Sequence, residues 1–118
     1  MTQQIAKAQI RDHGALDAIT TESTTSRTLG LSDNGSLISC TNGSAVTITI
    51  PTNAAVAFVV GTTVAIEQHG AGQVTISPDT GVTLRKRSST GKTAAQYATA
   101  QLVKLATNEW LLFGDLEA

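Results

Sequence analysis

Few residues of this 118-residue chain have the types and spacing that chemistry requires, and the best match is to a phosphate-binding loop. Thr90-Gly91-Lys92-Thr93 repeats the last four residues of the P-loop pattern. That pattern also needs a glycine five residues before Gly91, where this chain has Lys86. It further needs a helix whose first backbone N–H groups surround the phosphate, and no helical pattern follows. The sequence therefore argues against a P-loop nucleotide site.

The histidines and carboxylates also fail to form a recognisable site. His13 and His69 lie far apart and have no cysteine or carboxylate at the spacing of metal ligands. We expect no metal site within one chain, although a threefold axis could bring three copies of His69 together. Serine, histidine and aspartate are present without a nucleophile elbow. The carboxylates fall on predicted turns and strand faces and form no supported acid–base pair: Asp33, Glu67, Asp79, Glu109, Asp115 and Glu117. We expect neither an enzyme nor a cofactor.

Cys40 and the triplet Arg85-Lys86-Arg87 are the remaining reactive or charged features. The single cysteine cannot form an internal disulfide, and its apolar surroundings are typical of a small buried side chain rather than a nucleophile. The triplet has two interpretations, a solvated loop that keeps a sheet edge soluble or a contact with an acidic protein surface or polyanion. Three charges without neighbouring aromatic residues do not indicate nucleic-acid binding.

The composition predicts one domain with a modest core. Aromatic residues make up 3% of the chain, so Val, Ile, Leu and Ala must fill that core. A core this thin gains stability when a second apolar surface is buried against copies of the same chain. The net charge of -1 gives no field that attracts nucleic acid or an anionic membrane. No segment approaches the ~20 apolar residues of a membrane span, and we expect a chain that folds in a reducing cytoplasm.

Alternating apolar and polar residues predict strands along the chain from Thr28 onward. The run 46–50 reads VTITI, with one buried and one wet face, and Pro51 ends it. Further strands are predicted where the same alternation recurs between turns, at 28–31, 36–40, 64–67, 74–76 and 82–84. No amphipathic helix is visible. The predicted fold class is all-β, a single antiparallel β-sandwich or β-barrel-like domain over residues 28–118.

The last two predicted strands carry apolar residues at consecutive positions, which point to opposite faces of a sheet. A monomer with one core buries only one of these faces, so the other needs a cover such as the N-terminal arm, the opposing sheet or another copy. We predict a homo-oligomer, with a trimer as the expected form. Its candidate interface residues are Leu102, Val103, Trp110, Leu111, Leu112 and Phe113.

Residues 1–27 are predicted to form an extended N-terminal arm. The spacing of its large aliphatic residues fits neither a helical stripe nor a strand, and a polar run follows at 20–26. One interpretation is a mobile terminus, and the other is a tether that becomes ordered on a partner or a neighbouring subunit. Four isolated aliphatic residues favour the tether: Ile5, Ile10, Leu16 and Ile19.

The strand and turn segments from about residue 28 to 116 resemble a β-rich module that recurs in virion proteins of tailed bacteriophages. The most specific pieces are GAGQVTI at 70–76 and WLLFGDL at 110–116. In those proteins the module often forms the C-terminal domain of a tail or head appendage. The matching pieces are structural, so the resemblance implies a role in virion assembly and supplies no active-site residue. Only about 27 residues precede the module here, instead of a long shaft or coiled coil.

Two virion functions fit this resemblance. The first is a capsid decoration (head-stabilising) protein, made in the host cytoplasm, which binds the major capsid protein on the outer capsid surface as a homo-oligomer. The arm would then bind the capsid through its four aliphatic residues. The alternative is a receptor-binding module at a tail-fibre tip, and a weaker third is a subunit-assembly scaffold outside any virus. The short arm and the scarcity of aromatic residues favour the decoration protein.

Overall fold

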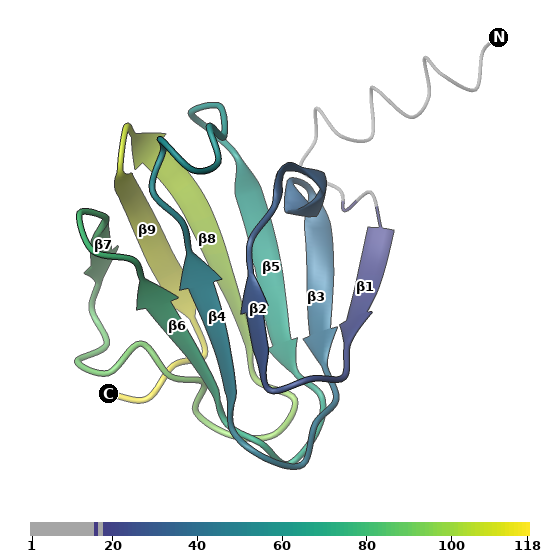
Figure 1. Cartoon of the computed structure of the whole chain (residues 1–118). Helices are drawn as coiled ribbons and strands as arrows, with labels where there is room; N and C mark the ends of the chain where they lie inside the picture. The colour runs from purple at the N-terminus through teal and green to yellow at the C-terminus, as the bar shows by residue number, and fades with distance from the viewer. Residues whose placement is uncertain (1–15, 17) are drawn as a thin grey trace, which may run out of the picture.

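The described part of the chain, Leu16 and residues 18–118, folds into two facing β-sheets in this computed structural model (Figure 1). The larger sheet has six strands in the order β1-β3-β5-β8-β9-β7, and the smaller has three in the order β2-β4-β6. A short 3-10 turn, Leu31–Asp33, precedes β3. The strands are β1 Ala18–Glu22, β2 Ser26–Thr28, β3 Ser36–Cys40, β4 Val46–Ile50, β5 Thr63–Gln68, β6 Val74–Pro78, β7 Thr83–Lys86, β8 Thr99–Ala106 and β9 Glu109–Gly114.

The first six strands form a coil of three two-strand turns. Each turn places one strand in the large sheet and the next in the small sheet, so β1, β3 and β5 pair in parallel, as do β2, β4 and β6. Like residues stack between turns, with Val46 beside Val74 and Ile48 beside Ile76. A single two-strand turn cannot bury its own apolar residues. These residues become buried when each turn stacks on its neighbours.

The coil is completed by an antiparallel pair, β8 and β9, added to the free edge of β5. The short strand β7 pairs in parallel with β9 at the far edge. The all-β prediction is confirmed, but five of the seven strand pairings are parallel, and the prediction of an antiparallel domain is wrong for most of the fold. Alternation reveals a strand and its faces without revealing its partner. The two sheets stay separate and do not close into a barrel.

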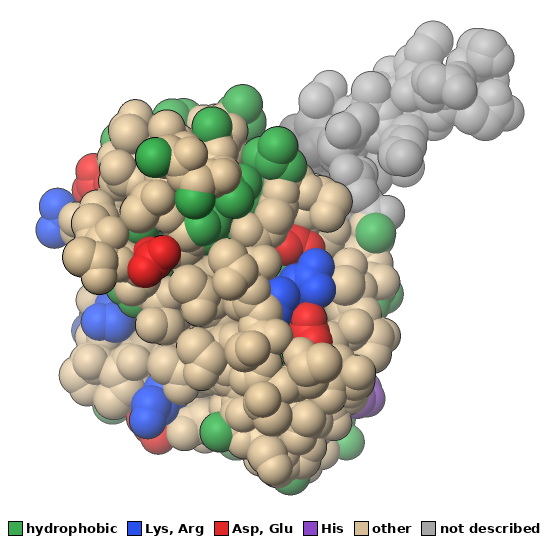
Figure 2. All heavy atoms as spheres, viewed as in Figure 1, with side chains coloured by type: hydrophobic (Ala, Val, Ile, Leu, Met, Phe, Trp, Pro, Cys, Tyr) green, Lys and Arg blue, Asp and Glu red, His purple; other side chains and the backbone are tan. Residues whose placement is uncertain are grey.

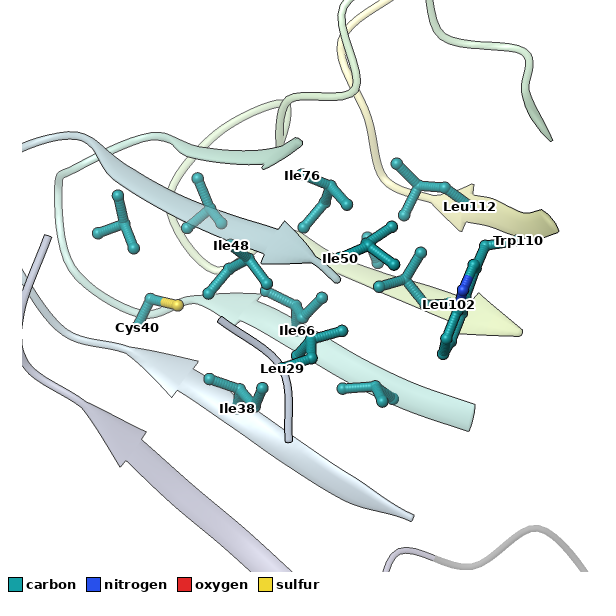
Figure 3. Close-up of a cluster of buried hydrophobic side chains, with 14 of the residues drawn as sticks. Leu29, Ile38, Cys40, Ile48, Ile50, Ile66, Ile76, Leu102, Trp110 and Leu112 are labelled. Atoms are coloured by element: carbon teal, nitrogen blue, oxygen red, sulfur yellow. The ribbon is translucent and has the colours of Figure 1, made fainter. Parts of the chain in front are cut away.

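Aliphatic side chains fill the space between the sheets (Figure 3). Ile38 and Ile66 from the large sheet face Ile48 and Ile76 from the small one, and all four are buried. Trp110 closes one side of this core, where the edge of its ring meets Phe58 at a centroid distance of 5.4 Å. Aromatic pairs prefer this edge-to-face geometry.

Two glycines allow the connections of neighbouring turns to lie in backbone contact. Gly70 and Gly72 follow β5 and lie against the connection that follows β3. The Gly72 N–H donates to the Asn42 carbonyl at 3.0 Å, and a Cβ atom at Gly72 would lie 1.8 Å from the Ser44 carbonyl oxygen. The GAG segment of 70–72 therefore sets how closely two turns of the coil approach.

The arm predicted at residues 1–27 divides into two parts. Residues 1–15 and 17, with Ile5 and Ile10, lie outside the described residues. From Ala18 onward the segment belongs to the sheets, because β1 pairs with β3 and β2 pairs with β4. The polar run at 20–26 concealed these strands, since backbone pairing at a sheet edge needs no apolar alternation. The β domain therefore includes residues 18–27.

Candidate functional site

The six apolar residues predicted as an oligomer interface divide between the two faces of the large sheet. Leu102, Trp110 and Leu112 point inward and are buried in the core, so for these three the interface prediction is wrong. Strand alternation turns the intervening residues, Val103, Leu111 and Phe113, toward the outside. The prediction of apolar side chains on both faces is therefore confirmed for these strands.

The outward side chains form rows that run across the large sheet. In one row the paired positions are Ile19, Leu37, Ala65, Gln101 and Phe113, which come from five neighbouring strands. The next row contains Val103 and Leu111, which pair directly between β8 and β9. Ile19 is 71% exposed and Phe113 is 45% exposed. We call the apolar members of these rows the outer apolar face: Ile19, Leu37, Ala65, Val103, Leu111 and Phe113.

A polar group lies beside this face, where β5 ends. The Ser39 hydroxyl donates to Glu67 Oε1 at 3.0 Å, and Glu67 Oε2 lies 3.3 Å from His69 Nδ1. Tyr97 lies edge-on to His69, with ring centroids 5.5 Å apart. The serine hydroxyl contacts the carboxylate and not the imidazole, so the group does not place a base beside a nucleophile. The pairing of Glu67 with His69 was not predicted. Its signal is the spacing of two residues, which places both side chains on one side of an extended chain.

A second charged group closes the side of the sandwich at β1 and β2. The Arg27 guanidinium donates to Glu22 at 2.9 Å and to Asp33 at 2.7 Å, and both carboxylates are nearly buried. Hydrogen bonds from the Thr24 hydroxyl and from Arg27 lower the pKa of Glu22, and the bond to Asp33 raises the pKa of Arg27. These side chains pair with one another, so the group joins β1, β2 and the turn before β3 and stabilises the fold.

Glu22→Gln tests this role through its pH dependence. The pKa of Glu22 in the folded state lies below its unfolded value of about 4.3. The stability that ionised Glu22 gives to the folded state is therefore complete above the unfolded pKa and is lost as the pH falls through the folded pKa. We expect the variant to melt below the wild type at pH 7 and the gap to narrow in acid. Thermal melting between pH 2 and 7 measures this, and a gap of constant size would contradict it.

The remaining candidates from the sequence have structural roles. Cys40 is buried, and burial raises the pKa of its thiol to about 11, so the thiolate needed for nucleophilic attack is disfavoured. Thr93 is buried, and its hydroxyl accepts a hydrogen bond from the Val74 N–H at 3.0 Å. No three His, Cys, Asp or Glu side chains in the described part of the chain are placed to hold a metal ion.

The basic triplet lies at the edge strand β7 and the loop that follows. Arg85 bonds to Glu109 at 3.0 Å, while Lys86 and Arg87 line a hollow of about 610 Å³ with Leu111, Phe113 and Leu116. The hollow shares two residues with the outer apolar face, so basic side chains border one end of that face. The two interpretations of the triplet, edge protection and an acidic partner, both fit this position.

The chain matches no protein-family model, no curated protein and no solved structure. No helix of the described residues is long and apolar enough to cross a membrane. The described residues present an apolar sheet face, two groups of charged side chains and a basic edge. The outer apolar face is the most extended of them, and apolar surfaces of this kind serve contacts with other macromolecules.

Proposed function

We propose that this chain is a capsid decoration protein of a tailed bacteriophage, which binds the outer capsid surface as a homo-oligomer. The observation that carries the proposal is the outer apolar face, with Phe113 and Ile19 held in water at its two ends. In the proposal, copies of the chain cover this face for one another, and the assembled oligomer binds the major capsid protein.

The cost of leaving this face in water supports an oligomer. Fully burying one Leu, Ile or Phe side chain from water is worth about 1.5–3 kcal/mol. On this face Ile19 and Phe113 are exposed, and Leu37, Val103 and Leu111 are partly exposed, so a partner could bury apolar surface of each. An exposed apolar sheet face is also an aggregation hazard, which soluble proteins avoid by covering it. Permanent interfaces are more apolar than transient ones, so the character of this face suits a stable assembly.

The stiffness of the sheet adds to this support. The face is built on backbone ladders of five consecutive strands, so its side chains are held in place before a partner arrives. A surface ordered in advance loses little conformational entropy on binding. A role in stabilising a shell needs such a rigid contact and requires no chemistry from the chain itself.

The alternative, a receptor-binding module at a tail-fibre tip, gains one observation. Tyr97 has a φ of 71°, which is rare for a bulky residue, and its side chain is 63% exposed. Backbone strain of this kind concentrates at functional sites, and tyrosine is enriched among residues that dominate binding energy. The pair of Tyr97 and His69 would be the contact in that case.

Sedimentation of the full chain tests the oligomer on which the proposal depends. We expect a stable oligomer at micromolar concentration, and we expect Phe113→Asp to weaken its association by at least about tenfold, equivalent to 1.4 kcal/mol. Thr47→Asp is the matched control, since Thr47 is exposed on β4 of the small sheet. A wild-type chain that stays monomeric would contradict the proposal.

A further inference from the structure

The loop between β4 and β5 holds two valines in water at one end of the sandwich. This loop, residues 51–62, contains no charged residue, and its Val59 and Val60 are 68% and 64% exposed. Their neighbours Phe58 and Thr62 are both buried. Residues 59–61 therefore lie at the surface between two buried residues, and they expose two aliphatic side chains.

The loop is anchored by a buried lysine. Lys104 is 3% exposed, and its amine donates to the Asn53 side-chain oxygen and to the Phe58 carbonyl, each at 2.6 Å. The Asn53 N–H donates in turn to the side-chain oxygen of Asn108 at 2.7 Å. Lysine is almost never buried without partners, and an apolar side chain at such a position often gives equal or greater stability. We therefore assign Lys104 a positioning role, because its hydrogen bonds to Asn53 and Phe58 hold the loop in place.

The part of the loop that leads into β5 is also held by hydrogen bonds. The Thr62 hydroxyl donates to the Val59 carbonyl at 2.6 Å, and the Gly61 N–H donates to the Lys104 carbonyl at 2.9 Å. On the other side, the Thr63 carbonyl accepts from the Gly35 N–H at 2.7 Å. Both valines are thus mounted on a fixed backbone, as side chains must be when they form a binding surface.

Two exposed leucines belong to the same end of the molecule. Leu31 lies in the turn that precedes β3, next to the Gly35–Thr63 contact, and Leu105 follows Lys104, which bonds to Gly61. Figure 2 shows hydrophobic side chains gathered at this end, over the loop that joins β4 to β5 in Figure 1. We call Leu31, Val59, Val60 and Leu105 the apolar end.

We propose that the apolar end is the surface that rests on the capsid, against an uncharged apolar patch of the major capsid protein. This inference rests on the proposed function and adds the orientation of the domain to it. The path of the chain favours the capsid as the partner of the apolar end. Residues 1–15 join the described chain at the N-terminal end of β1, and β1 starts beside Ser36, close to the turn that carries Leu31. In the proposed function, a shell that binds residues 1–15 therefore lies next to the apolar end.

The lack of charge on this surface argues against nucleic acid and anionic membranes as its partners. Nucleic acid and anionic membranes are held by Lys and Arg, and the loop of residues 51–62 offers none. Lys104 does not serve them, because its amine is turned inward. The outer apolar face lies on the flank of the large sheet, whereas Val59 and Val60 lie on the loop at its end. Copies can therefore cover that face while the two valines stay free for the shell.

Pelleting with purified capsids that lack the protein tests this orientation. The full-length variant Val59→Asp/Val60→Asp should bind capsids at least about tenfold more weakly than the wild type. The matched control Ala94→Asp/Ala95→Asp adds the same charges at exposed positions ahead of β8 and should bind as the wild type does. Val59→Thr/Val60→Thr, which keeps the side-chain shape, should weaken binding as well. Sedimentation and thermal melting should show that each variant remains a folded oligomer.

The outcomes separate the inference from the proposed function. Undiminished capsid binding by the aspartate variant, with the wild type binding normally, would overturn the orientation and leave the function standing. Dissociation of the folded aspartate variant into monomers would also overturn it, because a second copy would then occupy the apolar end. A wild-type oligomer that fails to bind capsids would overturn the proposed function, and the orientation with it.

Discussion

Replacing Trp110 with alanine is expected to lower the free energy of unfolding by about 3–5 kcal/mol, the usual cost of removing a buried aromatic ring. Trp110 is 1% exposed and lies at the side of the core (Figure 3). Its ring packs on Phe58, with ring centroids 5.4 Å apart. The loss has two parts, the transfer energy of the ring and the cavity left among rigid strands. Phe58 also loses its aromatic partner.

Chemical denaturation measures this effect, with Val60→Ala as the control. Val60 is exposed, and surface substitutions usually change stability by less than about 0.5 kcal/mol. The denaturation midpoint of Trp110→Ala should fall while the slope of the transition stays unchanged. An unchanged midpoint would place Trp110 on the surface and return it to the candidate interface.

Gly72→Ala is expected to cost about 3 kcal/mol or more, a large effect for one methyl group. The new Cβ would lie 1.8 Å from the Ser44 carbonyl oxygen and 2.8 Å from that of Asn42. Both contacts are with backbone, so no side chain can rotate away, and the two turns of the coil must separate. Separation breaks the hydrogen bond from Gly72 to Asn42.

The matched control for this substitution is Gly43→Ala in the opposing connection. A Cβ at Gly43 meets nothing within 4 Å, so the same methyl group there should leave the melting temperature nearly unchanged. Thermal melting of both variants makes the comparison. If Gly72→Ala had the same melting temperature as Gly43→Ala and the wild type, the close approach of the two turns would be wrong.

Strand positions could be predicted from the sequence far better than strand partners. The run at 46–50 matches β4, and Pro51 ends it as expected. The segment Asp33-Asn34-Gly35 is typical of a hairpin turn, yet the strands on its two sides, β2 and β3, lie in different sheets. A hairpin and a coil connection both need a tight polar turn between alternating strands, so local residues do not distinguish them.

The surfaces were predictable in part, for a related reason. Consecutive apolar residues in β8 and β9 indicated two apolar faces, but which residues face the core is decided by the opposing sheet. The anchoring of the loop of residues 51–62 could not be predicted from the sequence, because Lys104 and its acceptor Asn53 lie 51 residues apart. A buried lysine is identified by its partners, and these come together only in the fold.

Copy number in purified virions that carry this chain tests the central proposal most directly. A decoration protein covers the whole shell, whereas a tail-tip module is present only where the tail ends. Quantitative densitometry is therefore expected to show the chain at close to the abundance of the major capsid protein. A few copies per particle would contradict the decoration role and favour receptor binding at the tail tip.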